Sequence, residues 1–309
     1  MPAETSINQP LVSIGIPTYN RPAGLRHTLE CVTKQTYRNL EIVVSNNASP
    51  DDETDAIIRS YAANDDRIKY YKQDTNIGAF RNFEFVLTKA TGKYFVWFAD
   101  DDSCEQEFIG EIVACLERDD DVALAMCEIR FVDEMSGAES TMRLSSISVA
   151  RATRDWAVDR RLFFDISTEP VFMCIYGVYR TSVLKDCERL DFTSPWKKII
   201  AGSEIPFLSQ IAVRGKIVSV PGVLKTYRSH AGSAYIRERS RLRGLDHIIR
   251  NTELRILVTL TALRSDLALK DRVTLALTPW PSSFVGAKKV VRHKLGSLIN
   301  FALGSSANR

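Results

Sequence analysis

Residues 93–102 read KYFVWFADDD, an apolar run that ends in three consecutive aspartates. Three further runs rich in β-branched and aromatic residues precede it: LVSIGI (11–16), LEIVVS (40–45) and IKYYK (68–72). Stretches in which apolar residues recur at helical spacing separate these runs, which predicts alternating strands and helices. Such alternation indicates an α/β fold, a mainly parallel sheet covered by helices, with the ligand site at the carboxyl ends of the strands.

The rest of the chain adds further predicted elements. Helix start signals occur at Pro22, in the segment 49–52 and at Gly78. We predict a helix over 105–117, a strand over 122–127, and two short strands on either side of Pro221 and Gly222. From residue 236 onward the spacing predicts helices, including one run over 253–273.

The composition is that of an ordinary folded protein. The chain has 309 residues, of which 45% are hydrophobic and 26% charged, which excludes a disordered tail, a collagen-like repeat and a disulfide-stapled miniprotein. Its six cysteines include no C-x-x-C spacing, which favours a reducing compartment over a disulfide framework or a zinc cage. Because no window of 18 apolar residues occurs, we expect a cytoplasmic protein without a transmembrane segment.

The net charge of +3 hides a basic C-terminal extension. From Ile236 onward the chain carries fourteen Lys and Arg against five Asp and Glu, so we separate residues 236–309 from a domain over 1–235. Within this extension, the spacing of apolar residues over 283–303 predicts an amphipathic basic helix. It either packs on the domain or lies on an anionic membrane surface, on the inner face of the plasma membrane. Nucleic acid is not an expected partner, because aromatic residues do not interleave the basic ones.

The aspartate triplet, Asp100, Asp101 and Asp102, is the clearest chemical signal. Adjacent carboxylates repel one another, and a divalent cation or a ligand hydroxyl would relieve that repulsion. Oxygen ligands suit Mg²⁺ or Mn²⁺, which bridge to substrate phosphates rather than sit in a closed protein cage. The competing interpretation is a solvated acidic turn.

Five motifs in register resemble those of family 2 glycosyltransferases with the GT-A fold: IPTYNR (16–21), EIVVSNNASPDD (41–52), NIGAFRNF (76–83), WFADDD (97–102) and YRSHAGS (227–233). The resemblance covers residues 11–235 and implies a Rossmann-like, nucleotide-binding mixed sheet flanked by helices. It implies a nucleotide-binding half over 11–127 and an acceptor half over 128–235. The chain is most similar to bacterial enzymes that build O-antigen, lipopolysaccharide or exopolysaccharide, including abequosyltransferase-like members.

The resemblance assigns nucleotide contacts to residues after the first, second and fourth strands. The loop after the first strand lies against the nucleotide in this family, and Asp100 matches the carboxylate that bonds the ribose, with Asp101 beside it. The loop residues are Pro17, Thr18, Tyr19 and Asn20.

Asn46, followed by Asn47, matches the position that accepts a hydrogen bond from the base, where many relatives have an acidic residue. An amide can donate or accept, so uracil, thymine and cytosine all remain open. Arg81 matches the position that reaches the base or the phosphates. Plain turn residues at 46 and 47 and a surface ion pair at Arg81 are the competing interpretations.

The resemblance also implies a Mn²⁺ or Mg²⁺ ion on the diphosphate. Asp101 and Asp102 match its carboxylate ligands, and the sequence does not distinguish between them. His230 matches a third metal or diphosphate contact, for which neutral imidazole is a competent ligand, although a histidine at a strand end is often simply hydrogen-bonded. Ala99 stands where an acidic residue is common.

Glu204 aligns with the acidic residue that acts as general base in the family, where most relatives have Asp. A carboxylate there would take the proton of the acceptor hydroxyl. A glutamate in the first turn of a helix, stabilised by the helix dipole, is the competing interpretation.

The implied function is an inverting glycosyltransferase for hexosyl or deoxyhexosyl groups. It would move a sugar from a UDP-, dTDP- or CDP-sugar to a hydroxyl of a cell-surface glycan or lipid-linked oligosaccharide. The alternative is a catalytically inactive module that binds nucleotide sugar or glycan on the same fold. A nucleotidyltransferase is disfavoured, because IGIPTYNRPAG has no glycine-rich phosphate loop.

Overall fold

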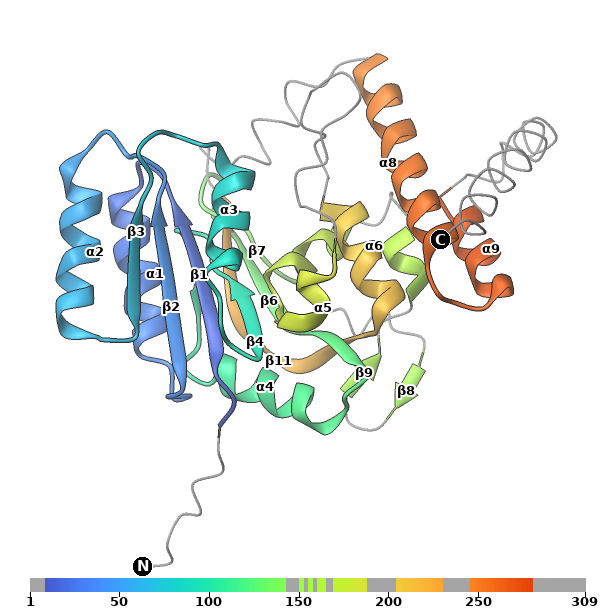
Figure 1. The fold of residues 1–309 in the computed structure, drawn as a ribbon, viewed down its shortest axis with the longest axis horizontal. Helices are drawn as coiled ribbons and strands as arrows, with labels where there is room; N and C mark the ends of the chain where they lie inside the picture. The colour runs from blue at the N-terminus through green and yellow to red at the C-terminus, as the bar shows by residue number, and fades with distance from the viewer. Residues whose placement is uncertain are drawn as a thin grey trace, which may run out of the picture.

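The computed structural model describes residues 9–142, 150–152, 155–157, 160–164, 169–187, 204–229 and 245–279. Within these residues, eleven strands pair into one mixed sheet whose main path runs β3-β2-β1-β4-β10-β6-β11-β9-β8. Helices lie on both sides of this sheet (Figure 1). The prediction of a mixed sheet flanked by helices is confirmed.

The first four strands run parallel, as predicted: β1 (Val12–Thr18), β2 (Leu40–Asn46), β3 (Ile68–Lys72) and β4 (Tyr94–Trp97). Every residue of β1 and β2 is buried, which fits strands covered on both faces. The connecting helices begin where Pro22, the Asp51 cap and Gly78 predict, and they are α1 (Pro22–Thr33), α2 (Asp52–Asn64) and α3 (Ala79–Thr88). The loops after β1, β2 and β4 therefore meet at one edge of the sheet.

The second half inserts an antiparallel strand, β10 (Val178–Arg180), between β4 and β6 (Val122–Asp133). β11 (Lys216–Ser229) runs parallel to β6, and the short β5 (Ser103–Cys104) pairs with it just after the aspartates. The remaining elements here are α4 (Phe108–Arg118), β7 (Glu139–Met142), β8 (Ala150–Ala152), β9 (Asp155–Ala157), α5 (Thr181–Lys185), α6 (Glu204–Arg214) and the 3-10 helices η2 (Arg160–Phe164) and η3 (Glu169–Tyr176).

The prediction of two strands around Pro221 and Gly222 is wrong, because β11 runs through both residues. Its pairing with β6 shifts between Val220 and Lys225, so the strand is bulged there. Proline has no N–H for a ladder hydrogen bond and is tolerated at such an irregularity, and Gly222 adopts a φ of +110° that few other residues accept. The turn signal in the sequence marks a bulge rather than a chain reversal.

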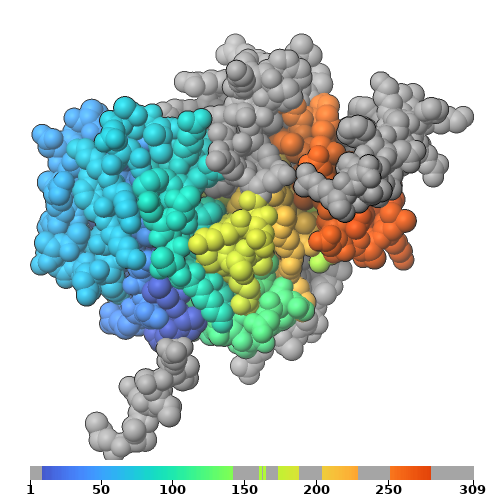
Figure 2. All heavy atoms as spheres, viewed as in Figure 1, coloured from blue at the N-terminus to red at the C-terminus, as the bar shows by residue number. Residues whose placement is uncertain are grey.

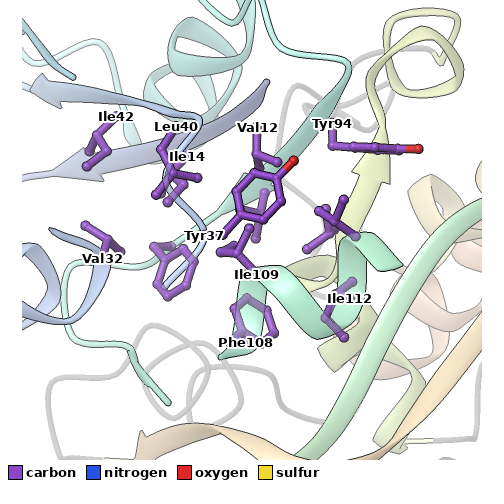
Figure 3. Packing of buried hydrophobic residues seen from close by; sticks show 14 of the residues in the cluster. Val12, Ile14, Val32, Tyr37, Leu40, Ile42, Tyr94, Phe108, Ile109 and Ile112 are labelled. Atoms are coloured by element: carbon purple, nitrogen blue, oxygen red, sulfur yellow. The ribbon is translucent and has the colours of Figure 1, made fainter. Parts of the chain in front are cut away.

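Apolar side chains pack on both faces of the sheet. On one face, Ile109 of α4, Tyr37 and Val12 of β1 belong to one apolar cluster (Figure 3). On the other, the indole of Trp97 makes edge contacts with Tyr179 and Phe207 at centroid separations of 5.5 and 6.0 Å. Burial of each large apolar side chain contributes about 1.5–3 kcal/mol, so these contacts hold β4, the strand from which the aspartates emerge.

The C-terminal part of the described chain forms two helices, α8 (Leu245–Arg264) and α9 (Leu269–Leu277), where the sequence predicts one continuous run over 253–273. The first helix ends at Arg264. The hydroxyl of the next residue, Ser265, donates to the Ala262 carbonyl (2.7 Å), and Ala268 is extended before the second helix. Val258 and Leu275 are buried in the core that includes α6 residues. Both helices lie on the side of the molecule away from the first strands (Figure 2). No helix in the described ranges is long and apolar enough to span a membrane.

Candidate functional site

Asp100 lies just after β4 and is 7% exposed. Its Oδ2 accepts a hydrogen bond from Thr18 Oγ1 at the end of β1 (2.8 Å), and its Oδ1 accepts one from Arg21 Nη1 (3.2 Å). Burial raises the pKa of Asp100 to about 6, although the Arg21 charge and the Thr18 hydroxyl oppose that rise. The loops after β1 and β4 thus converge on one carboxylate.

Asp101 has the most accessible side chain of the three aspartates, at 22% exposed. Its Oδ2 lies 2.8 Å from Arg21 Nη2, so a single guanidinium bridges Asp100 and Asp101 through two different nitrogens. Arg21 immediately precedes α1 and was not among the predicted site residues. Its place in the motif IPTYNR, directly after four predicted nucleotide contacts, is the signal that could have found it.

Asp102 is engaged differently from its two neighbours. Its carboxylate forms a 3.0 Å ion pair with Lys225 of β11, in which each side chain is 2% exposed, and it also accepts the Ala99 amide (3.2 Å). The Lys225 ammonium lies 4.3 Å from the centre of the Phe98 ring. The sequence left Asp101 and Asp102 interchangeable as cation ligands; in the structure Asp102 pairs with a buried lysine and Asp101 with a partly exposed arginine. Lys225 was also missed, and a lysine inside the run VLKTY is its signal in the sequence.

Helix α1 packs against the aspartate loop through Thr28 and Gly24. Thr28 Oγ1 lies within hydrogen-bond distance of the Asp102 and Ala99 carbonyl oxygens, at 3.0 and 3.2 Å. Gly24 comes so close to the loop that an added Cβ would lie 2.3 Å from the Asp100 carbonyl oxygen. Any side chain at position 24 therefore requires the aspartate loop to shift.

The asparagines after β2 bond within the protein. Asn46 is fully buried; its Nδ2 donates to Asp55 (2.7 Å) and its Oδ1 accepts the Ser49 amide (2.9 Å). Asn47 bonds the segment 76–77 in the same two-sided way. Both amide atoms of Asn46, the predicted base contact, already have protein partners, so the two asparagines organise the loops around the site.

The other predicted nucleotide residues lie around the same edge. Pro17 is buried within β1, and Tyr19, the next residue after that strand, is 43% exposed. Asn20 adopts a φ of +53°, which asparagine tolerates, and its amide donates to Ser49 Oγ (2.8 Å), which ties the loops after β1 and β2 together. Arg81 is exposed in the first turn of α3.

Glu204 is the first residue of α6 and is partly exposed. Burial is the main cause that raises the pKa of Tyr176 well above its ordinary value, and the negative charges of Asp102, Glu204 and Asp101 add to the rise. Helix α6, which begins at Glu204, packs against η3, the 3-10 helix that carries Tyr176. The Lys225 ammonium, which pairs with Asp102, lies 4.8 Å from the centre of the Tyr176 ring.

Two predicted features, His230 and the segment 283–303, lie outside the described residues. In the part of the chain that the structure does describe, no group of three or more His, Cys, Asp or Glu side chains is arranged to hold a metal ion. An open depression of about 330 Å³ is lined by residues such as Arg160, Ile217 and Leu275, and none of the predicted site residues contributes to it.

The sequence model of the family described as glycosyl transferase family 2 matches residues 13–187, more than half of the chain. Among curated relatives, a Campylobacter jejuni GalNAc(5)-diNAcBac-PP-undecaprenol beta-1,3-glucosyltransferase is 37% identical over 94 residues, which are 30% of either chain. An uncharacterized glycosyltransferase from Rickettsia bellii is 39% identical over 94 residues, 30% of this chain and 13% of the relative. The matches therefore span well under half of the length of these relatives.

Solved structures resemble the fold. Staphylococcus aureus TarS (residues 1–349) in complex with UDP-GlcNAc superposes with a TM-score of 0.63 at 17% identity, over 91% of this chain and 74% of that one. The Pyrobaculum calidifontis mannosyltransferase PcManGT in complex with GDP-Man and Mn²⁺ gives a TM-score of 0.56 at 18% identity, over 97% and 79% of the two chains. At these identities the likeness concerns the fold alone.

Proposed function

Because the chain belongs to glycosyltransferase family 2, we propose that it transfers a sugar, with inversion at the anomeric carbon, from a nucleotide sugar to a hydroxyl of a glycan or lipid-linked oligosaccharide. The observation that carries this proposal is the convergence of Thr18, Arg21, Asp100 and Asp101 at the carboxyl edge of the sheet. Ligands of open α/β sheets bind at this edge.

On the donor side, we assign the ribose to Asp100 and the nucleobase to the exposed ring of Tyr19. An ionised Asp100 can accept a hydrogen bond from a ribose hydroxyl, and an exposed phenol ring offers a face on which a base can stack. The resemblance in fold to a TarS structure that holds UDP-GlcNAc makes a UDP-sugar the first donor to test, followed by dTDP- and CDP-sugars.

The carboxylates of this site are suitable ligands for a divalent cation. The guanidinium of Arg21 already lies on oxygens of both Asp100 and Asp101, which indicates that the pair accepts positive charge. Mg²⁺ and Mn²⁺ need only one or two protein carboxylates and complete their coordination with water and substrate phosphates. We assign this role to Asp101, the more accessible carboxylate, together with His230. A bound cation would stabilise the negative charge that develops on the departing diphosphate.

On the acceptor side, Glu204 is the proposed general base. Its carboxylate takes the proton from the acceptor hydroxyl while that oxygen attacks the anomeric carbon from the face opposite the nucleoside diphosphate. The new carbon–oxygen bond forms as the bond to the diphosphate oxygen breaks, so a single displacement inverts the configuration. The packing of α6 on η3, whose Tyr176 contacts the lysine partner of Asp102, supports this role.

A lipid-linked acceptor agrees with the name of the Campylobacter relative, which acts on an undecaprenol-linked oligosaccharide. Such an acceptor would give the basic segment 283–303 a partner, because anionic lipid attracts each Lys or Arg near the surface by about 1 kcal/mol. We therefore propose peripheral association with the inner face of the plasma membrane. Flotation of the full chain with liposomes should require anionic lipid and should weaken for K288Q/K289Q.

The test of the function is a mass-spectrometric screen of UDP-, dTDP-, CDP- and GDP-sugars for transfer or hydrolysis, with and without Mn²⁺. Glu204→Gln should lower turnover by about a hundredfold or more while nucleotide binding persists. The control, Asp271→Asn, removes a first-turn carboxylate from α9 and should keep full turnover. Equal turnover of the two variants would reject Glu204 as base, and the absence of both turnover and binding for every donor would reject the function.

A further inference from the structure

The two cations that contact the aspartate triplet differ in their freedom to move. Lys225, the partner of Asp102, is 2% exposed and lies over the rings of Phe98, Phe108 and Tyr176. The side chain of Arg21 is 36% exposed, and its partner Asp101 is 22% exposed. A displaced guanidinium can therefore reach solvent or ligand, whereas the lysine is enclosed.

Arg21 contacts the carboxylate oxygens that the proposed donor and cation would need. Nη1 is 3.2 Å from Asp100 Oδ1, and Nη2 is 2.8 Å from Asp101 Oδ2. The other oxygen of Asp100 already accepts the Thr18 hydroxyl. A cation on these carboxylates would repel the guanidinium at close range, so the two positive charges compete for the same site.

The donor offers Arg21 another partner. A guanidinium binds phosphate oxygens through two parallel hydrogen bonds as well as it binds carboxylates. Mg²⁺ and Mn²⁺ usually complete their coordination with water and substrate phosphates, so a diphosphate would strengthen the binding of a cation that Asp101 holds weakly by itself. Diphosphate and cation would therefore enter together, and the arginine would change partners as they do.

We propose that Arg21 is an internal counter-ion that neutralises Asp100 and Asp101 in the donor-free enzyme, then moves to the donor diphosphate and releases Asp100 to the ribose and Asp101 to the divalent cation. The inference rests on the proposed function. It makes cation and nucleotide binding mutually dependent and keeps the affinity of the empty enzyme for the cation low. Arg21 is thus a coupling residue between the two ligands.

The test measures Mn²⁺ binding to the full chain by the loss of the free-ion signal in electron paramagnetic resonance, first with Mn²⁺ alone and then with UDP, CDP or dTDP present. Wild type should bind Mn²⁺ weakly alone and at least about fivefold more tightly with the matching nucleotide. Arg21→Gln should bind Mn²⁺ alone at least about fivefold more tightly than wild type, and the gain from nucleotide should disappear. Arg21→Lys retains the charge and should stay close to wild type with Mn²⁺ alone.

Arg26→Gln is the matched control. It removes one positive charge from α1, the helix that directly follows Arg21. Arg26 lies 3.8 Å from Glu53, both side chains are more than half exposed, and the change should leave both affinities unchanged. Equal Mn²⁺ affinity of wild type and Arg21→Gln, with binding that Asp101→Asn still abolishes, would overturn the role of Arg21 and leave the proposed cation site intact. Absence of any Mn²⁺ binding that depends on Asp101 would overturn the cation itself and the inference with it.

Discussion

The Asp102 carboxylate and the Lys225 ammonium form an ion pair 3.0 Å long in which both side chains are 98% removed from solvent. One partner belongs to the loop after β4 and the other to β11, on the far side of the intervening strands β10 and β6. The pair therefore holds the aspartate loop to the second half of the sheet.

Removal of the Lys225 side chain should lower the free energy of unfolding far more than removal of a surface lysine. Lys225→Met leaves the Asp102 charge buried without its partner, and we expect the free energy of unfolding to fall by about 3–5 kcal/mol. The double variant K225M/D102N should recover most of that loss. Urea unfolding measures both values.

The control is Lys93→Met, which breaks an exposed pair with Glu117 and should lower the free energy of unfolding by less than about 1 kcal/mol. Equal losses for the two lysine variants would contradict a buried ion pair between Asp102 and Lys225.

A methyl group at position 24 should disturb donor binding more than stability. In Gly24→Ala the new Cβ would meet the Asp100 carbonyl oxygen at 2.3 Å, so the loop must move, and we expect nucleotide affinity or turnover to fall by about tenfold to a hundredfold. Gly110→Ala is the control, because a Cβ there meets nothing within 4 Å and should stabilise α4 by about 0.5–1 kcal/mol. Titration calorimetry and thermal unfolding separate the two effects. Unchanged nucleotide affinity and turnover in Gly24→Ala would show that the loop tolerates the shift.

Glu41 should make the protein sensitive to acid. Burial alone would raise the pKa of this carboxyl, but hydrogen bonds from Lys69, Ser13 and Thr91 outweigh it and lower the pKa to about 2. Because the folded-state pKa lies below the unfolded value of 4.5, the stabilisation is complete above pH 4.5 and is lost as the pH falls toward 2. The shift corresponds to about 3 kcal/mol.

Urea unfolding at pH 7, 5 and 3 tests this dependence. Glu41→Gln should be destabilised most at pH 7, and its difference from wild type should shrink as the pH falls below 4.5. Glu53→Gln replaces an exposed carboxylate of α2 and should follow the wild-type profile. A constant difference between Glu41→Gln and wild type across this range would contradict the lowered pKa.

The exposed ring of Tyr19 should contribute to nucleotide affinity by stacking. Tyr19→Ala should weaken binding of the matching nucleoside diphosphate by about 1–3 kcal/mol, or roughly five- to 150-fold, whereas Tyr19→Phe keeps the ring and should bind like wild type. Fluorescence or calorimetric titration measures the two dissociation constants. Equal affinities for all three proteins would place the base elsewhere.

Short-range signals explain how much of the fold could be predicted from the sequence. The first four strands and the helix starts at Pro22 and Gly78 depend on residues close together in the chain, and they agree with the structure. The bulge at Pro221 could not be distinguished from a turn, because both tolerate a proline followed by a glycine with positive φ. The break between α8 and α9 falls on residues without proline or glycine, so the sequence carries no signal for it.

The site was only partly predictable for a related reason. The aspartates and Thr18 could be placed at one edge, because strands of a parallel sheet end together. The different partners of Asp101 and Asp102 could not be predicted, because no residue near the triplet in the sequence indicates that Lys225 of a distant strand pairs with Asp102. Likewise, the amide of Asn46 could bind a ligand as far as the sequence shows, and only the structure shows that it forms hydrogen bonds with Asp55 and Ser49.

The distance in sequence between Asp102 and Lys225 has a consequence for biosynthesis. Lys225 follows Asp102 by 123 residues, so the ribosome adds the lysine about 6–25 s after the aspartate at 5–20 residues per second, when the whole nucleotide half is already complete. During that interval Asp102 has no lysine partner, so its carboxylate cannot yet be buried as part of an ion pair. The donor-binding loop would therefore mature only after β11 has emerged from the exit tunnel, and a truncated chain that ends before that strand should not acquire a stable site.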